Sequence, residues 1–174
     1  MQSMFAGASN FNQSIGNWNT SNVIDMKYMF SLASSFNQPI GNWNTSNVTD
    51  MGFMFYSAIS FNHPINNWNT FNMHDMRLMF AYATSFNQPI NNWNTSNVLD
   101  MSYMFTDAIN FNQPIGNWDV SHVFGSAMSG MLNNCGMDCT NYSSTLNGWA
   151  NNINTPNFSN LGAVGIKYGT NAVT

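Results

Sequence analysis

Four aspartates recur at one position of the sequence, and their side chains are the ones best suited to chemistry. A row of carboxylates could bind a cation such as calcium, which takes oxygen ligands. The alternative is structural, because each aspartate falls in the first turn of an expected helix, where the helix dipole favours a negative charge. We prefer the structural role. The four evenly spaced aspartates are Asp25, Asp50, Asp75 and Asp100.

Histidines and cysteines do not form a recognisable catalytic or metal-binding set. His63, His74 and His122 occupy different positions in the repeated pattern, so no base is placed beside a nucleophile. Cys135 and Cys139 are the two cysteines, and a structural zinc site needs four ligands. The pair is therefore either a local disulfide, which secretion would favour, or two free thiols. We expect no catalytic, cofactor or metal site, and so no enzyme.

The composition predicts a well-filled core and a nearly uncharged surface. Hydrophobic residues make up 44% of the chain and aromatic residues 15%, but charged residues only 6%, against about 25% in typical proteins. The net charge is −4 and there is no basic cluster, which argues against binding to nucleic acid or an anionic membrane. The sequence contains no run of about 18 apolar residues, so it predicts no transmembrane segment.

A regular sequence repeat organises the chain. The tryptophans Trp18, Trp43, Trp68, Trp93 and Trp118 are evenly spaced, with the same step in residue number each time (43 − 18 = 25). Such a period is typical of a solenoid, in which each coil covers its apolar side by stacking on its neighbours.

Each repeat is predicted to contain one strand and one helix. A short strand is expected near residues 38–43, with the proline at its start. Val48, Met51, Met54 and Phe55 begin an apolar stripe with helical spacing, so a helix is expected over about 48–58. The predicted fold is a right-handed, leucine-rich-repeat-like α/β solenoid with one short parallel strand and one short helix per coil. Its expected core comprises Trp18, Trp43, Trp68, Trp93 and Trp118; Phe30, Phe55, Phe80 and Phe105; and Ile40, Ile65, Ile90 and Ile115.

The same period aligns polar residues in rows. Two asparagine rows are expected to form structural ladders rather than a ligand site, because buried amides need partners. A threonine row could present regularly spaced hydroxyls, and Phe71 interrupts an otherwise serine-rich row. The asparagine rows are Asn37, Asn62, Asn87 and Asn112, and Asn42, Asn67, Asn92 and Asn117; the threonine row is Thr20, Thr45, Thr70 and Thr95.

Two regions are expected. Residues 1–125 form the five-copy repeat solenoid, with an incomplete first copy, since Met1 stands where a repeat residue belongs. We therefore expect the chain to be a piece of a longer protein. Residues 126–174 form a C-terminal capping segment, expected to be truncated, with a short helix from near Asn141 and a weak strand pattern over 161–168.

The repeat resembles a known family. The string Met-Phe-x-x-Ala-x-x-Phe-Asn-Gln-Pro-Ile-Gly-Asn-Trp-Asn-Thr-Ser-Asn-Val-x-Asp-Met, present over residues 1 to about 132, resembles the BspA-like (DUF285) surface-protein repeat. The resemblance implies a secreted or cell-surface bacterial domain, leucine-rich-repeat-like, used in adhesion or protein–protein contact. It brings no catalytic residues.

Three functions are consistent with these observations. The first is a non-enzymatic binding module that contacts a protein or glycan at a cell surface. The second is a structural spacer or subunit of an extracellular assembly, with neighbouring copies as partners. The third is an ice- or polymer-binding array built on the threonine row.

Overall fold

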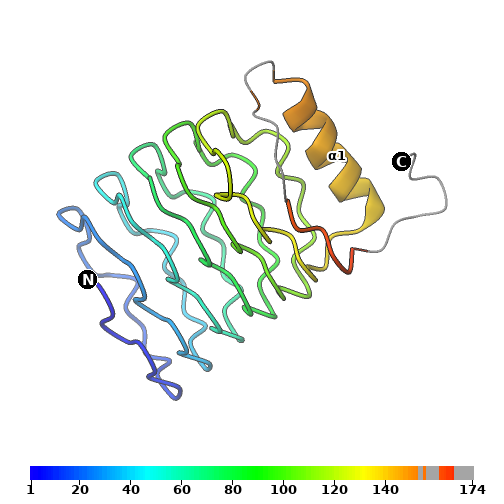
Figure 1. Ribbon diagram of the computed structural model, residues 1–174. Coiled ribbons are helices and arrows are strands. Elements are labelled where there is room, and N and C mark those ends of the chain that lie inside the picture. Colours follow the sequence, from blue (N-terminus) through cyan, green and yellow to red (C-terminus); the bar gives the residue numbers. More distant parts are fainter. Residues whose placement is uncertain (153–154, 156–160, 167–174) are drawn as a thin grey trace.

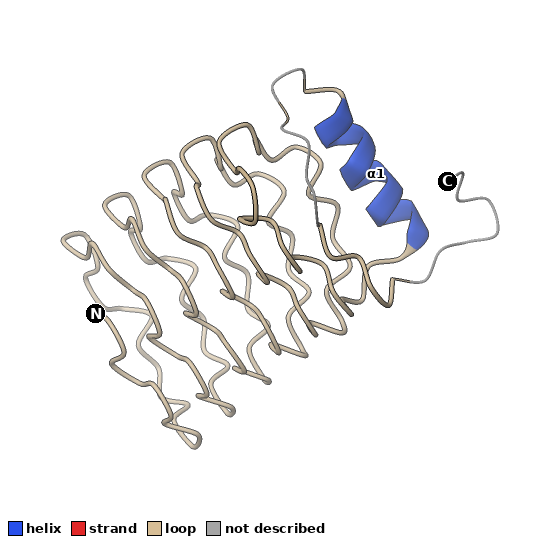
Figure 2. Cartoon of the chain, in the orientation of Figure 1, coloured by secondary structure: helices blue, strands red, loops and turns tan. Residues whose placement is uncertain are grey.

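The protein is a stack of similar coils, seen in a computed structural model that describes residues 1–152, 155 and 161–166. The coils follow one another along a single axis from the N-terminus, and the helix α1 (Cys139–Ala150) packs beyond the last of them (Figure 1). Among the described residues α1 is the one helix, and no strand is present (Figure 2). The expected solenoid with a strand and a helix in each coil is therefore wrong.

Turns replace the expected helix because alternate peptide groups bond in different directions. The Tyr28 N–H donates to the Gly52 carbonyl of the next coil at 3.1 Å, and the Phe30 N–H donates to the Met54 carbonyl at 2.9 Å. The N–H of Ser31, which follows Phe30, closes a local turn on the Tyr28 carbonyl at 3.1 Å. Since alternate N–H groups serve the neighbouring coil, they cannot form the bonds of a continuous α-helix.

The backbone conformation of these turns also excludes a helix. Tyr28 and Leu32 have φ values of 58° and 62°, and residues in this left-handed region do not continue a right-handed helix. Equivalent residues of later coils repeat the conformation: Phe53, Ser57, Leu78, Tyr82, Tyr103 and Asp107. The threes and fours in the apolar spacing thus reflect successive short turns.

The expected strand near residues 38–43 is absent for a different reason. Across this part of the coil, side chains bond to the backbone of neighbouring coils in place of a backbone ladder. The Trp43 indole Nε1 donates to the Ile15 carbonyl at 3.1 Å, and the Thr45 hydroxyl donates to the Asn69 carbonyl at 2.9 Å. Pro39 has no N–H with which to extend a ladder. Parallel bridging between coils is limited, in the described residues, to isolated pairs along the aspartate row.

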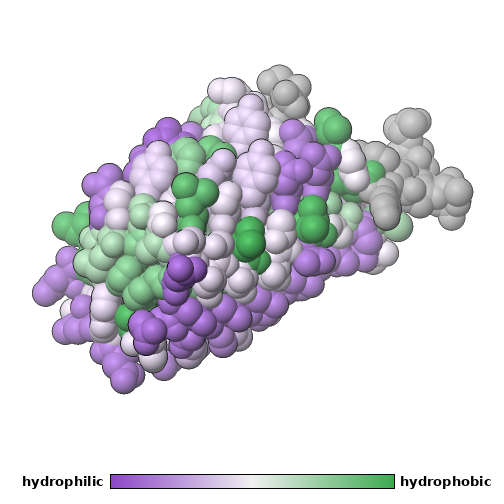
Figure 3. Space-filling model, turned by 90° about the horizontal axis from the view of Figure 1, so that it is seen from below, coloured by the Kyte–Doolittle hydropathy of each residue, from purple (hydrophilic) through white to green (hydrophobic). Residues whose placement is uncertain are grey.

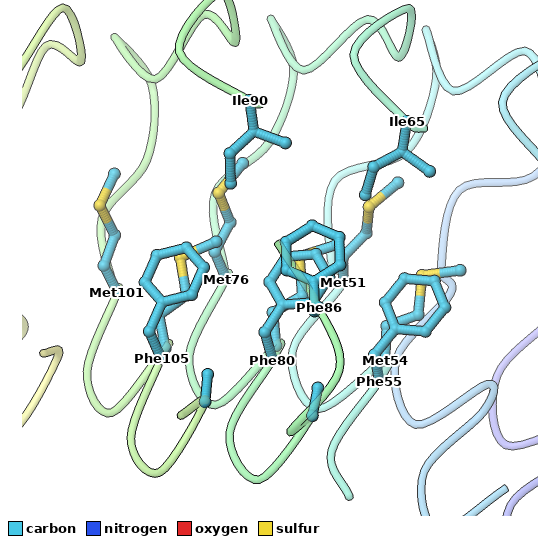
Figure 4. Close-up of a cluster of buried hydrophobic side chains, with 14 of the residues drawn as sticks. Met51, Met54, Phe55, Ile65, Met76, Phe80, Phe86, Ile90, Met101 and Phe105 are labelled. Atoms are coloured by element: carbon cyan, nitrogen blue, oxygen red, sulfur yellow. The ribbon is translucent and has the colours of Figure 1, made fainter. Parts of the chain in front are cut away.

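Aromatic rings fill the core in columns that run along the stack. Within one coil Phe30 stacks on Phe36 at 3.9 Å between ring centroids, and between coils Phe55 stacks on Phe80 at 5.4 Å. Figure 4 shows rows of phenylalanine, methionine and isoleucine repeated from coil to coil. The structure buries these expected core residues: Trp43, Trp68, Trp93, Trp118, Phe30, Phe55, Phe80, Phe105, Ile40, Ile65, Ile90 and Ile115. Trp18 differs, at 39% exposed, because it lies in the first coil, which has a neighbour on one side in this structure.

The segment after the repeats closes the other end of the stack. Asp138 caps α1 by accepting from the Asn141 N–H at 2.8 Å, which confirms the helix expected near Asn141. The helix lies close enough to the last regular coil for Gly148 to face Gly116. Residues 161–163 continue the pattern of the turns, since the Leu132 N–H donates to the Gly162 carbonyl at 3.1 Å. The weak strand expected over 161–168 is not formed in 161–166, and 167–168 lie outside the described residues.

Candidate contact surface

One side of the stack carries most of the exposed apolar residues, and we call it the turn side. It comprises the outward side chains of residues 1–9, 24–34, 49–59, 74–84, 99–109 and 124–134. Of the twelve large hydrophobic residues exposed among the described ones, the turn side holds nine. They are Met4, Ile24, Leu32, Ile59, Tyr82, Leu99, Tyr103, Ile109 and Phe124. The other three, Trp18, Phe71 and Val164, lie elsewhere. Figure 3 shows a face on which hydrophobic and near-neutral residues gather above a hydrophilic edge.

Bulky side chains occupy left-handed backbone positions on this side. Tyr28, Phe53, Leu78 and Tyr103 are equivalent residues of successive coils, with φ values between 51° and 60°. A residue with a Cβ pays about 1–2 kcal/mol in this region, and glycine avoids that cost. The local backbone therefore does not explain why large residues recur there.

The rings on the turn side lie against one another along the stack. Tyr28 stacks on Phe53 with 4.6 Å between centroids, and Tyr56 meets Tyr82 edge to face at 5.5 Å. Tyr103 is 44% exposed and lies over Gly130, where an added Cβ would overlap its ring. The result is an aromatic strip that is partly open to solvent.

A cluster of charges lies beside the aromatic strip. The Lys27 ammonium is 3.3 Å from Asp50 Oδ2 and 3.9 Å from Asp75 Oδ2. It also lies 5.8 Å from the centre of the Tyr28 ring. Arg77 Nε is 3.2 Å from Asp75 Oδ2, and the Arg77 side chain is 39% exposed. The turn side thus combines aromatic contact area with both signs of charge.

Burial raises the pKa of Asp75 above its ordinary value of 3.8, because the carboxylate loses hydration, and the negative charge of Asp50 acts in the same direction. The hydrogen bond from the Arg77 backbone and the charges of Arg77 and Lys27 oppose this change. Packing within the row therefore disfavours the ionised form of Asp75 despite two basic neighbours.

The aspartate row has a structural role, although not the one expected. With no helix in the described coils, there is no helix dipole for it to stabilise. Instead each Oδ1 accepts the N–H two residues further on, as Asp50 does from Gly52 at 2.8 Å and Asp100 from Ser102 at 2.8 Å. Within the described part of the chain, no group of three or more His, Cys, Asp or Glu residues could hold a metal ion.

The threonine row is buried, and this overturns the hypothesis of an ice- or polymer-binding hydroxyl array. Thr45 and Thr70 are 1% and 2% exposed, and Thr20 and Thr95 are equally enclosed. Each hydroxyl donates to a carbonyl of the following coil at 2.9–3.0 Å. The hydroxyls therefore fasten coils together and present no surface.

One asparagine ladder is confirmed and extends into the cap. The Asn62 N–H donates to Asn37 Oδ1 at 3.0 Å, and the Asn87 N–H donates to Asn62 Oδ1 at 2.9 Å. The last step has the Asp138 N–H donating to Asn112 Oδ1 at 2.9 Å. In the row of Asn42, Asn67, Asn92 and Asn117 the contacts are irregular; for example, Asn92 donates to the Asn66 carbonyl at 2.9 Å.

The comparisons with known proteins are consistent with this repeat architecture. The family described as "Mycoplasma protein of unknown function, DUF285" matches residues 1–84 and 64–161. The chain belongs to the DUF285 family. No curated protein and no solved structure matches it. In the described part of this DUF285 chain, no helix has both the length and the apolar character needed to cross a membrane.

The cysteines of this DUF285 chain are separate thiols in the structure and do not form the disulfide considered from the sequence. Cys135 is buried, and the loss of hydration raises the pKa of its thiol. It lines a pocket of about 310 Å³ with Met137 and Gly165, and no histidine of the described residues lines that pocket. The arrangement gives the thiol no adjacent imidazole base.

Sequence reasoning placed the aspartates and the asparagine ladder in rows but missed the aromatic strip. A signal for it is present, because a large residue stands three positions after each of the four aspartates, at Tyr28, Phe53, Leu78 and Tyr103. Helical spacing leaves those positions outside the apolar stripe. The turn conformation that directs these side chains outward is set by hydrogen bonds to neighbouring coils, which local spacing does not reveal.

Proposed function

We propose that this chain is a non-enzymatic binding module, secreted or displayed at a cell surface, which contacts a protein partner through its turn side. The observation that carries the proposal is the row of large residues at left-handed positions, Tyr28, Phe53, Leu78 and Tyr103. Glycine or asparagine would satisfy the backbone there at lower cost. A contact surface gives these large side chains a use beyond the packing between neighbouring coils.

The composition of the turn side supports a protein partner. Tyrosine, phenylalanine, methionine and arginine are enriched in protein interfaces, and charged residues lie toward the rim. The turn side supplies such residues, including the partly exposed side chain of Arg77 beside the aromatic strip. The amide-rich remainder of the coil uses many of its side chains to bond to neighbouring coils, as Asn47 and Asn72 do.

The proposal is tested by measuring how a fluorescently labelled chain binds to intact cultured epithelial cells. The double variant Leu99→Asn/Tyr103→Asn should lose most of this binding, whereas Asn91→Arg, on the exposed amide side, should retain it. Binding should also disappear after the cells are treated with protease. Binding that survives the turn-side variant would contradict the proposal, and absence of binding by the unaltered chain would favour the spacer function.

A further inference from the structure

We propose that the turn side binds a second copy of this chain. The two copies are related by a twofold axis, and their turn segments run in roughly opposite directions across the interface. The inference rests on the proposed function because it uses the same turn side, for which a cell-surface partner and a second copy of the chain would compete. A twofold interface brings one patch against itself, so the patch must be complementary to itself after a rotation of 180°. The distribution of charge and aromatic residues on the turn side meets that requirement.

The complementarity comes from two adjacent coils. The central turns of these coils run over residues 77–82 and 102–107, so Arg77 begins one segment and Asp107 ends the next. These segments lie side by side, because the Leu78 N–H donates to the Ser102 carbonyl at 2.9 Å and the Tyr82 N–H donates to the Thr106 carbonyl at 2.8 Å. A twofold axis that lies in the plane of the interface, passes through the middle of the two segments and is perpendicular to the line from Arg77 to Asp107 places Arg77 of each copy against Asp107 of the other.

The side chains of Arg77 and Asp107 can both take part in such an ion pair. The Arg77 side chain is 39% exposed, and its ion pair with Asp75 runs through Nε. Asp107 accepts a hydrogen bond from the Asn134 amide at 3.0 Å through Oδ1. In the described part of the chain Asp107 forms no ion pair with a basic side chain. Arginine can bind a carboxylate of a second copy through its terminal nitrogens.

Apolar residues surround the proposed axis and supply the contact area. Leu78 is half-buried, Tyr82 is 41% exposed and Tyr103 is 44% exposed. All three have positive φ values, so they share the left-handed conformation of the row described above. Aromatic residues at the centre with charged pairs beside them are typical of the energetic core of an interface. In the proposed dimer these side chains would interdigitate and leave solvent.

Sedimentation velocity with charge-reversed variants tests the proposal. The unaltered chain should form a dimer in a concentration-dependent manner, and both Arg77→Glu and Asp107→Arg alone should be monomeric, because each would place like charges together twice. An equimolar mixture of the two variants should restore the dimer, since one of the two contacts then pairs the introduced charges with each other and the other pairs Arg77 with Asp107. Asn91→Arg serves as the matched control and should remain dimeric.

Mixing the two charge-reversed variants separates loss of the dimer contact from loss of folding. Variants that are damaged by their substitutions would not recover on mixing, and thermal unfolding of each variant reports folding directly. A monomeric unaltered chain, or folded variants that stay dimeric alone or monomeric when mixed, would overturn the dimer. Loss of cell binding in the turn-side variant of a monomeric chain would still support the proposed function, so the two failures are distinguishable.

Discussion

At the scale of single residues, two kinds of aromatic side chain serve different purposes. Phe105 is fully buried and stacks on Phe80 and Phe111, at centroid distances of 5.7 Å and 3.9 Å. Tyr103, two residues earlier, points outward from a left-handed position with a φ of 56°. The core ring stabilises the stack, and the outer ring occupies a conformation that its Cβ makes costly.

Substitutions of Tyr103 and Phe105 should therefore change the free energy of unfolding by very different amounts. Tyr103→Asn should change the free energy of unfolding by less than about 1 kcal/mol, because relief of backbone strain offsets the lost surface contacts. Phe105→Ala should cost about 3–5 kcal/mol through the lost burial and the cavity. Chemical denaturation measures both values. Equal destabilisation by the two variants would mean that Tyr103 belongs to the core.

At the scale of elements, the contact between α1 and the stack depends on glycine. A Cβ added to Gly148 would overlap the carbonyl oxygen of Gly116 and lie 2.6 Å from the Gly116 Cα. These are backbone atoms and cannot rotate away as a side chain could. Gly148→Ala should therefore push the helix from the last coil.

The expected cost of Gly148→Ala is about 1–3 kcal/mol, even though alanine favours helix formation by about 1 kcal/mol relative to glycine. Hydrogen exchange should show faster exchange of amides in α1, and thermal unfolding should show a lower midpoint. The matched control is Asn147→Ala at the exposed neighbouring position, which should leave the docking intact. Unchanged protection in Gly148→Ala would contradict the close approach.

The N-cap of α1 makes the end of the stack sensitive to acid. The hydrogen bond from the Asn141 N–H, assisted by the Asn112 amide, lowers the pKa of Asp138 below its ordinary value of 3.8. A carboxyl whose pKa is lower in the folded protein stabilises it above the ordinary pKa, and this contribution is lost as the pH falls through the folded pKa.

The circular dichroism signal of α1 should therefore decline as the pH falls below 3.8, the ordinary pKa of an aspartate. Asp138→Asn keeps an N-cap acceptor but has no titrating group, so the acid-dependent part assigned to Asp138 should disappear in that variant. The pKa of Asp119 is also lowered, mainly by its hydrogen bond with Ser121. Its titration occurs in both proteins and therefore does not contribute to the difference between them. Identical acid profiles for the two proteins would contradict the prediction.

The elements also show what the sequence could and could not predict. The repeat period was sufficient to place the asparagine ladder and the buried tryptophans after the first, and the residues beyond the last repeat predicted the capping helix. Along residues 48–58, however, the apolar spacing suits both a helix and successive turns, and the choice depends on where the N–H groups of Met51, Phe53 and Phe55 bond. They bond to the next coil, and that long-range pairing outweighs local helical preference. The exposure of Tyr103 follows from the same pairing, whereas Thr45 points inward where its hydroxyl donates to the Asn69 carbonyl of the next coil.

At the scale of the whole molecule, stability should be distributed over the interfaces between successive coils. In the regular register each donor bonds to an acceptor one coil further along, at a constant step in residue number, as in Met26 to Asp50 (50 − 26 = 24) and Met76 to Asp100. At the last coil the step grows, from Met101 to Ala127 (127 − 101 = 26). The chain therefore contains two additional residues there, which end the aspartate row and begin the transition to α1.

Deleting one complete coil should leave this architecture intact. Removal of residues 51–75 joins Asp50 to Met76 and preserves every periodic position, so the shortened chain should still fold, with a lower unfolding midpoint because one interface between coils is lost. Removal of 52–75, one residue fewer, shifts each outward side chain relative to its row and should prevent regular stacking. Near-ultraviolet circular dichroism and tryptophan fluorescence would distinguish packed from unpacked indoles. Because Arg77 and Asp107 remain on adjacent coils after the first deletion, that protein should also retain the proposed dimer. If both deletions fold equally well, coil register does not control the structure.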